Sequence, residues 1–219
     1  MTVAPDGDHD WTRAIPGVEP RVKRAALGKL RIIGGRWRSR SLAFPARAAV
    51  RPTPDRVRET LFNWLADRVV GSRCLDLFAG SGALGFEAVS RGAGHVTMVE
   101  RDGALLRYLS EQAQAFDADN VELVRKDAVR WVKFARPAHT APFDIVFLDP
   151  PFSSDLMALL CHQLEEGGWL RSEAFVYLEM PGRRAAPALP GNWVLTQAGR
   201  AGQVGYQLVR RCREPGGGD

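Results

Sequence analysis

From Arg73 onward, short apolar runs alternate with longer stretches of mixed polar and apolar residues. The runs have the length of β-strands, and the stretches between them are long enough for crossover helices. This alternation is typical of an α/β protein with a parallel sheet and helices on both of its faces. We expect strands at 73–78, 95–100, 120–125, 143–149 and 174–180, and helices near 83–91, 102–116, 127–135 and 154–165.

The two ends of this pattern differ from its middle. Residues 192–211 contain two apolar runs joined by a short loop with glycine, which predicts an antiparallel hairpin at the edge of the sheet. Residues 29–45 predict a small β-hairpin around Gly34 and Gly35. Residues 53–69 predict a helix with Thr53 as its cap and Pro54 at its first position. The expected organisation is a disordered tail at 1–28, a basic hairpin extension at 29–52, one domain at 53–212 and a disordered tail at 213–219.

Length and cysteine content limit the class of protein. A chain of 219 residues is long enough for one well-buried core. The three cysteines are odd in number and far apart, so they provide neither a disulfide framework nor a CxxC metal site, and we expect no metal. Asp6, Asp8 and Asp10 occupy the region where a signal peptide would be apolar. We therefore expect a cytoplasmic protein without a membrane segment, with a monomer as the default state.

Basic residues are concentrated in one window of the chain. Residues 21–58 hold twelve Lys and Arg and one acid, a net charge of +11, whereas the rest of the chain has a net charge of −6. Trp37 and Phe44 lie between these arginines, which favours a folded surface over a charged tail. A solvated face is the alternative, but this density of positive charge favours nucleic acid as the partner.

A glycine-rich turn, "FAGSGALG", follows the first expected strand. Gly80, Gly82 and Gly85 fit the pattern GxGxxG, which serves either a tight turn with close helix packing or a ligand that lies against the backbone. Asp76 precedes the glycines, and Glu100 ends the second expected strand, where a carboxylate can accept both hydroxyls of a ribose. An acid beside the turn disfavours the pyrophosphate of a nicotinamide dinucleotide and favours a cofactor with a positive end, such as S-adenosylmethionine.

Two further acids follow expected strands. Asp127 comes after the third strand, where it can accept a hydrogen bond from an adenine amino group, cap the next helix, or do both. Asp149 ends the fourth strand and is followed by the rigid turn Pro150-Pro151 and by Phe152. A carboxylate oxygen and a fixed carbonyl oxygen make a two-acceptor clamp for an exocyclic amino group, and the aromatic ring offers a face for stacking a base. The alternative is a turn that only ends a strand.

Such a clamp suits methylation of a nucleobase amine. The lone pair of this amine is delocalised into the ring, and holding both N–H bonds aims it at a methyl donor. The protein contributes mainly orientation and electrostatics, so neither a metal nor a cysteine nucleophile is needed.

In combination, "DLFAGSGALGFEA", "VERD" and "DPPF" resemble the motifs of Rossmann-type S-adenosylmethionine-dependent methyltransferases that act on amino groups. The flanking segments "RIIGGRWRSRSL", "RPTPDRVRETLFNWL" and "AGQVGYQLVRR" are similar to the bacterial 16S ribosomal RNA guanine-N2 methyltransferase family, over residues 29–211. The resemblance implies a Rossmann-like class I fold with a mostly parallel seven-stranded sheet. It also implies methylation of the N2 amino group of one guanosine in 16S rRNA, in the small ribosomal subunit or an assembly intermediate.

The resemblance further implies roles for individual residues. The implied cofactor site comprises Thr53, Asp76, Phe78, Gly80, Gly82, Glu100, Arg101, Asp127, Ala128 and Asp149. The implied site for the target base comprises Asp149, Pro150, Pro151 and Phe152. The implied RNA surface comprises Arg36, Arg38, Arg40, Arg51 and Arg56. Three other functions stay open at this point: a DNA adenine or cytosine amino-methyltransferase, a nicotinamide-dependent oxidoreductase, and a non-catalytic RNA-binding module. The sequence leaves open which guanosine is modified and whether it receives one methyl group or two.

Overall fold

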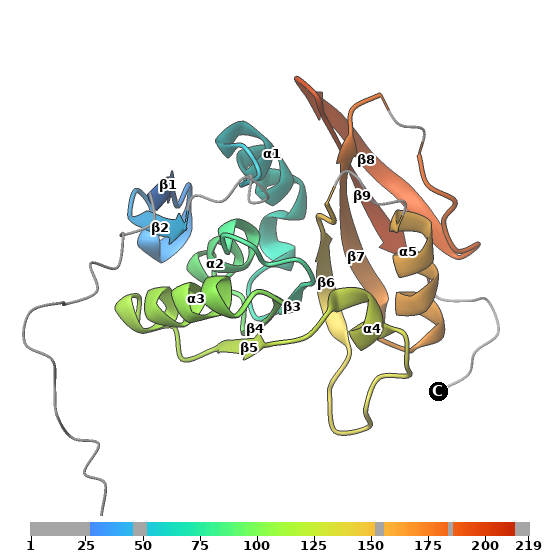
Figure 1. Ribbon diagram of the computed structural model, residues 1–219. Coiled ribbons are helices and arrows are strands. Elements are labelled where there is room, and N and C mark those ends of the chain that lie inside the picture. Colours follow the sequence, from blue (N-terminus) through green and yellow to red (C-terminus); the bar gives the residue numbers. More distant parts are fainter. Residues whose placement is uncertain (1–26, 46–51, 152–155, 184–185, 213–219) are drawn as a thin grey trace, which may run out of the picture.

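A seven-stranded sheet forms the centre of the protein (Figure 1). The computed structural model describes residues 27–45, 52–151, 156–183 and 186–212. The strand order is β5-β4-β3-β6-β7-β9-β8; the first five strands are parallel, and β9 is antiparallel to both of its neighbours. The predicted α/β fold and its C-terminal antiparallel hairpin are confirmed. The strands are β3 (Arg73–Asp76), β4 (His95–Val99), β5 (Val121–Val124), β6 (Phe143–Leu148), β7 (Leu170–Pro181), β8 (Trp193–Ala201) and β9 (Val204–Arg211).

Helices cover both faces of this sheet, as the sequence predicts. The core consists of two apolar clusters, one packed under three helices and the other under two. Ile145 and Phe147 of the central strand β6 belong to the first cluster, and Val146 and Leu148 of the same strand belong to the second. Strand side chains point alternately to opposite faces, so the two clusters are the two layers of the core. The first layer holds α1 (Asp55–Leu65), α2 (Ala83–Ser90) and α3 (Gly103–Ala115), and the second holds α4 (Ala128–Val132) and α5 (Met157–Glu166) (Figure 1).

A second, two-stranded sheet precedes the main domain. It pairs β1 (Leu27–Arg31) with β2 (Ser41–Pro45) in antiparallel register, and a short 3-10 helix, η1 (Gly35–Trp37), lies in the connection. The predicted hairpin is therefore present, and its first strand begins two residues before the expected start. Trp37 is buried against α2 and the end of α3, where it contacts the rings of Phe86 and Phe116. This contact packs the extension against the main domain beside α2 and α3 (Figure 1).

Some predicted boundaries are wrong. The helix expected from residue 53 begins at Asp55 with Pro54 as its cap, because the Pro54 carbonyl accepts hydrogen bonds from the amides of Val57 and Arg58 (2.9 and 3.0 Å). Thr53 is therefore not the cap, and the helix is followed by the 3-10 turn η2 (Ala66–Arg68). β7 begins four residues earlier than expected, because Leu170 already pairs with Phe143 before a register shift in the ladder.

Candidate active site

The carboxyl ends of three neighbouring strands bring acidic residues to one edge of the sheet. Asp76 is the last residue of β3, Glu100 follows β4 and Asp149 follows β6. In the register of the sheet, Asp76 is opposite Met98 of β4, two residues before Glu100. Asp76 is also opposite Phe147 of β6, two residues before Asp149. Open α/β sheets bind their ligands at this edge. The structure therefore places these three predicted site residues close together.

The glycine turn between β3 and α2 has backbone conformations that suit glycine. Gly80 and Gly82 have φ angles of 50° and 78°, which lie in the left-handed region. A Cβ atom at Gly82 would lie 2.7 Å from Leu109 Cδ2, and one at Gly85 would lie 2.4 Å from Met98 Cε. Gly82 thus serves the turn and Gly85 the close packing of α2 on β4.

Glu100 ties the end of β4 to this turn. Its Oε2 accepts a hydrogen bond from the Gly80 amide (3.0 Å), and its Oε1 accepts one from the Asp102 amide (2.8 Å). An ionised carboxylate has about four acceptor positions, so each oxygen retains capacity for a further donor. These contacts fix the carboxylate at the position from which it could accept the hydroxyls of a ribose.

Asp76 is buried, and burial raises the pKa of its carboxyl to about 7. The hydrogen bond that Oδ2 accepts from the Gly85 amide (3.0 Å) lowers this pKa in part, whereas the negative charge of Glu100 raises it further. A positive group bound nearby would favour the ionised form of this carboxyl. The environment of Asp76 therefore fits the positively charged end of S-adenosylmethionine.

Asp149 lies beside a second buried acid, Glu179 of β7. Burial, then Glu179 and then Asp76 raise the pKa of the Asp149 carboxyl well above its usual range. Glu179 Oε2 accepts a hydrogen bond from the Tyr177 hydroxyl (2.8 Å), and the Glu179 carboxylate accepts another from the Thr53 side chain. Our sequence reasoning missed Glu179. The sequence feature that could have indicated it is an acid inside the apolar run "AFVYLEM". Glu179 comes directly after Leu178, which pairs with Leu148 of β6.

Asp127 caps α4. Its Oδ1 accepts a hydrogen bond from the Arg130 amide (3.0 Å), and its Oδ2 lies 3.9 Å from Arg101 Nη1 in an exposed ion pair. The capping role is therefore present, and it leaves Oδ2 partly open to a ligand. Of the other residues expected near the cofactor, Ala128 is buried in the first turn of α4 and Phe78 packs partly buried against the second core layer.

The remaining site predictions divide into those that the structure describes and those that it does not. Pro150 is buried and Pro151 is exposed directly after β6. Phe152 and Arg51 lie outside the described residues. Arg36, Arg38, Arg40 and Arg56 are exposed on the hairpin extension and the first turn of α1.

Aromatic rings order two of these arginines. The guanidinium carbon of Arg36 lies 4.4 Å from the Trp37 ring centroid, and that of Arg40 lies 4.2 Å from the Phe116 ring centroid. The two rings stack on each other with centroids 4.7 Å apart. Arg40 also donates to the Ala115 carbonyl (2.9 Å), so this side chain helps to dock the extension on α3. Cation–π contacts of this kind fix cations while leaving them exposed.

The sequence reasoning also missed a buried ion pair next to the site. Arg58 of α1 and Glu87 of α2 are both fully buried, and Arg58 donates to the carbonyls of Thr53 (3.2 Å) and Arg31 (2.8 Å). Glu87 accepts from the amides of Ile33 and Gly34, both at 2.8 Å. The pair therefore connects the hairpin extension and Thr53 to the helices over the first face of the sheet.

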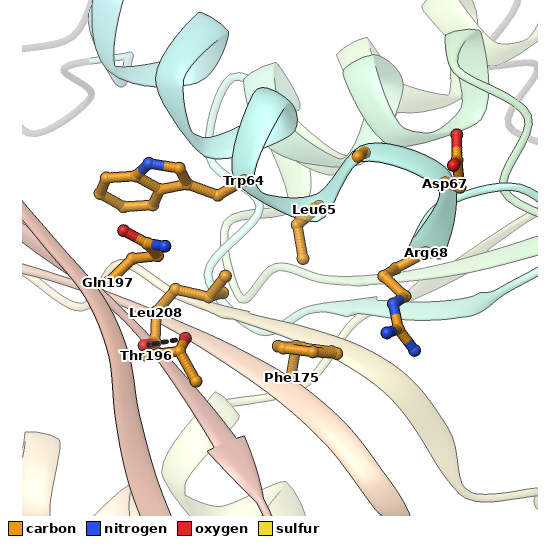
Figure 2. Close-up of a pocket in the computed structure, with 9 residues that line it drawn as sticks. Trp64, Leu65, Asp67, Arg68, Phe175, Thr196, Gln197 and Leu208 are labelled. Carbon is orange, nitrogen blue, oxygen red and sulfur yellow. Dashed lines mark hydrogen bonds between the residues drawn. The ribbon is translucent and has the colours of Figure 1, made fainter.

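Two hollows in the described structure lie away from the acidic edge. One, of about 280 Å³, lies between the end of α1 and the β8–β9 hairpin. Its lining includes Trp64, Arg68 and Phe175 (Figure 2). The other, of about 450 Å³, lies at the amino ends of β3 and β6, near Arg73 and Asp144. Neither contains an acid from the carboxyl edge, so the candidate site is defined by its chemistry rather than by these hollows.

Within the described ranges, no group of three or more His, Cys, Asp or Glu residues is placed so that it could hold a metal ion. In the same ranges, no helix has both the length and the apolar character needed to cross a membrane.

The fold and this edge define a class of protein. A parallel sheet closed by an antiparallel hairpin, a glycine turn after the first strand of the main sheet, and acids at the ends of β3, β4 and β6 are the features of a Rossmann-like methyltransferase.

Comparison with known proteins identifies the family. Residues 30–210 match the family model described as "Conserved hypothetical protein 95". The chain is 45% identical to ribosomal RNA small subunit methyltransferase D of Escherichia coli over 184 residues, which cover 84% of this chain and 91% of that protein. The chain therefore belongs to the family that this model describes, which includes ribosomal RNA small subunit methyltransferase D.

Solved structures support the assignment. A putative methyltransferase from Escherichia coli has a TM-score of 0.77 and 43% identity, with 85% of this chain and 100% of that chain covered. A 16S rRNA N2 G1207 methyltransferase of Thermus thermophilus, solved with AdoMet and guanosine, has a TM-score of 0.57 and 21% identity, with 86% and 50% covered. The second likeness concerns the fold alone.

Proposed function

We propose that the protein transfers a methyl group from S-adenosylmethionine to the exocyclic N2 amino group of a guanosine in 16S rRNA, within the small ribosomal subunit or an assembly intermediate. The observation that carries this proposal is the convergence of Asp76, Glu100 and Asp149 at one edge of the sheet, with two prolines directly after Asp149. Membership of a family that includes a small-subunit rRNA methyltransferase supports the choice of RNA.

The acids along this edge would divide the cofactor between them. Asp76 would face the methionine ammonium, Glu100 the ribose hydroxyls, and the exposed Oδ2 of Asp127 the adenine amino group. S-adenosylmethionine supplies an electrophilic methyl group on a sulfonium, which is a good leaving group. The burial of Asp76 supports this division, because a desolvated carboxyl with a pKa of about 7 is stabilised in its ionised form by a cation.

Asp149 and the Pro150 carbonyl would hold the two N–H bonds of the guanine amine. This grip takes the nitrogen out of conjugation with the ring and directs its lone pair away from the two acceptors, toward the methyl donor. The contribution is one of orientation and fixed charge, which together lower reaction barriers by several kcal/mol. Pro150 has no amide hydrogen, so no N–H of its own competes with the amine.

The hairpin extension would bind the RNA backbone. Arg36, Arg38 and Arg40 are exposed within a window of net charge +11, and stacking on Trp37 and Phe116 orders two of them. Ordered guanidinium groups lose less entropy when they bind phosphate. Arg56 at the first turn of α1 would extend this surface toward the acidic edge.

The decisive test is to map methylated nucleotides in rRNA from cells with and without this protein. A guanosine that carries an N2-methyl group only when the protein is present is the expected result. Incubation of the purified protein with labelled S-adenosylmethionine and either 30S particles or duplex DNA tests the alternative function, methylation of DNA adenine or cytosine. Labelling of DNA adenine or cytosine, with none of rRNA, would replace the proposal by a DNA amino-methyltransferase.

A further inference from the structure

Glu179 is a buried acid that the proposed reaction does not use. It belongs to β7, which pairs with β6 in parallel register from Ile145 to Leu148, and Leu148 is opposite Leu178. The next residue on each strand is an acid, Asp149 on β6 and Glu179 on β7. The pleat therefore places the two carboxyls side by side at the end of the sheet, one partly exposed and one 4% exposed.

Two hydroxyl groups hold Glu179 in place. The Tyr177 hydroxyl donates to Oε2 at 2.8 Å, and the Thr53 side chain donates to the same carboxylate. Tyr177 reaches it from the same strand, whereas Thr53 reaches it from the segment before α1. Hydrogen bonds that a carboxylate accepts favour its ionised form over the protonated one. Burial raises the pKa of Glu179, and these two hydrogen bonds offset part of that rise, so they favour a negative charge beside Asp149.

Stability does not explain this arrangement. Burying the Glu179 carboxyl next to the Asp149 carboxyl opposes folding, and an apolar residue at position 179 would avoid the cost of burying a charge. Adjacent acids whose environments differ are typical of sites that move protons.

We propose that Glu179 is a positioning residue for methyl transfer: its fixed carboxylate, held by Tyr177 and Thr53, makes Asp149 the group that accepts the proton released by the target amine. This inference rests on the proposed function. As the nitrogen bonds to the methyl carbon, the carbon–sulfur bond breaks and its electron pair stays on sulfur. The methylated nitrogen then still carries both of its hydrogens and a positive charge, so it must lose one proton. Asp149 takes that proton from the N–H that it already holds, which leaves a neutral methylated amine, and later releases it to solvent.

Other titratable groups surround the pair. Among the residues that the structure describes, Asp76 approaches from β3, Tyr177 from β7 and Tyr206 from β9, where it is opposite Glu179. From α1, Arg58 donates to the Thr53 carbonyl rather than to either acid. Because Asp76 is placed toward the cofactor, its titration should appear in the KM for S-adenosylmethionine, whereas that of the Asp149–Glu179 pair should appear in kcat.

The first test compares kcat of the wild type and Glu179→Gln between about pH 5 and pH 9, with S-adenosylmethionine and 30S particles both saturating. Activity needs ionised Asp149, so kcat falls as the pH falls through the pKa of that carboxyl. Removal of the neighbouring negative charge makes Asp149 easier to ionise and a weaker base. We expect the acidic limb to move down by about one pH unit and the plateau of kcat to fall by up to about tenfold.

Two variants separate this role from a structural one. Thr53→Val removes one hydroxyl that holds Glu179 and should move the acidic limb in the same direction by a smaller amount. Glu166→Gln, at the exposed end of α5 and away from the site, should change neither the limb nor the plateau. Loss of kcat in Glu179→Gln with an unchanged acidic limb would overturn the proposal, because misplacement alone does not change the charge on Asp149.

A measurement without substrate separates this inference from the proposed function. The carboxyl carbon of Asp149 can be titrated by NMR in protein labelled with ¹³C-aspartate and assigned by its loss in Asp149→Asn. The expected result is a lower titration midpoint in Glu179→Gln than in the wild type. Equal midpoints would refute the coupling whatever the enzyme methylates, whereas failure to methylate guanine N2 alongside shifted midpoints would refute only the assigned reaction.

Discussion

Arg58 Nη1 lies 3.1 Å from Glu87 Oε2, and neither side chain is accessible to solvent. The guanidinium also bonds to the Arg31 carbonyl of the hairpin extension, and the carboxylate bonds to the amides of Ile33 and Gly34. The basic extension is therefore joined to the methyltransferase domain through a buried charged network as well as through the apolar contacts of Trp37. The network fixes where the exposed arginines lie relative to the acidic edge.

Glu87→Gln should destabilise the protein strongly. The substitution keeps the shape of the side chain but removes the buried one of the two carboxylates that pair with Arg58, the other being Asp55 at 2.6 Å. Breaking a buried ion pair costs about 3–5 kcal/mol. Urea unfolding should therefore show a free energy of unfolding lower by about 3 kcal/mol. Glu111→Gln, on the exposed side of α3, serves as the control and should stay within about 0.5 kcal/mol of the wild type. A Glu87→Gln protein as stable as this control would mean that the network does not dock the extension.

Asp149→Ala should abolish methyl transfer and leave cofactor binding nearly intact. Asp149 is placed to hold the target amine, whereas Asp76 and Glu100 are placed to hold the cofactor. Removal of one fixed group that acts in the transition state lowers kcat by about 10²–10³. Calorimetry with S-adenosylmethionine and single-turnover methylation of 30S particles measure the two effects separately. Full activity in the variant would refute the role assigned to Asp149.

Much of the fold follows from local sequence patterns. The alternation after Arg73 predicts the parallel sheet because each apolar run has strand length and each intervening stretch permits only a crossover helix. The ends of these strands are marked by Asp76, Glu100 and Asp149, so the acidic edge is also predictable from the sequence. Parallel strands must end at the same edge, and acids that follow them therefore converge whatever the details of packing.

The missed residues depend on contacts between distant segments. Glu87 lies in an apolar helix and reads as a surface acid, but the backbone amides that it bonds come from residues more than 50 positions earlier. Glu179 becomes notable only when the register pairs β7 with β6. The start of β7 and the cap of α1 were misplaced for a related reason, since ladder pairing and the Pro54 carbonyl set those boundaries rather than propensity.

Asp76 should make stability depend on pH in a predictable direction. Its pKa is about 7 in the folded protein against an ordinary value of 3.8, so between these values the folded chain holds a proton that the unfolded chain releases. The free energy of unfolding therefore falls as the pH rises from about 4 to about 7, by an amount on the order of 4 kcal/mol from this group. Asp76→Asn keeps an acceptor for the Gly85 amide and should remove that part of the slope.

The measurement is urea unfolding of both proteins across this pH range. The two curves should meet near the low end and separate as the pH rises, with the variant the more stable protein near pH 7. Parallel curves would show that Asp76 does not hold a proton in the folded state at these pH values. Asp149 and Glu179 give slopes of the same sign in both proteins. Because Asp76 also raises the pKa of Asp149, the difference between the curves reports Asp76 together with its smaller effect on Asp149.

The hairpin arginines should set the salt dependence of RNA binding. Each phosphate neutralised releases counterions, so the logarithm of the binding constant falls with the logarithm of salt concentration by about one per contact. Changing Arg36, Arg38 and Arg40 to Glu should weaken binding to 16S rRNA and make this slope shallower by about two to three. Arg171→Glu makes the same change of charge as any one of these three substitutions, but at the amino-terminal start of β7, at the end opposite the acidic edge, and should leave the slope unchanged.

Because Arg40 also bonds to the Ala115 carbonyl, Arg38→Glu alone separates RNA binding from docking of the extension. It should reduce the slope by about one while leaving the free energy of unfolding within about 0.5 kcal/mol of the wild type. If the triple variant binds RNA with an unchanged slope, the phosphates lie elsewhere. Arg200, near the turn between β8 and β9, is then the next position to change, because this turn bonds to Gly182 just beyond Glu179 at the end of β7.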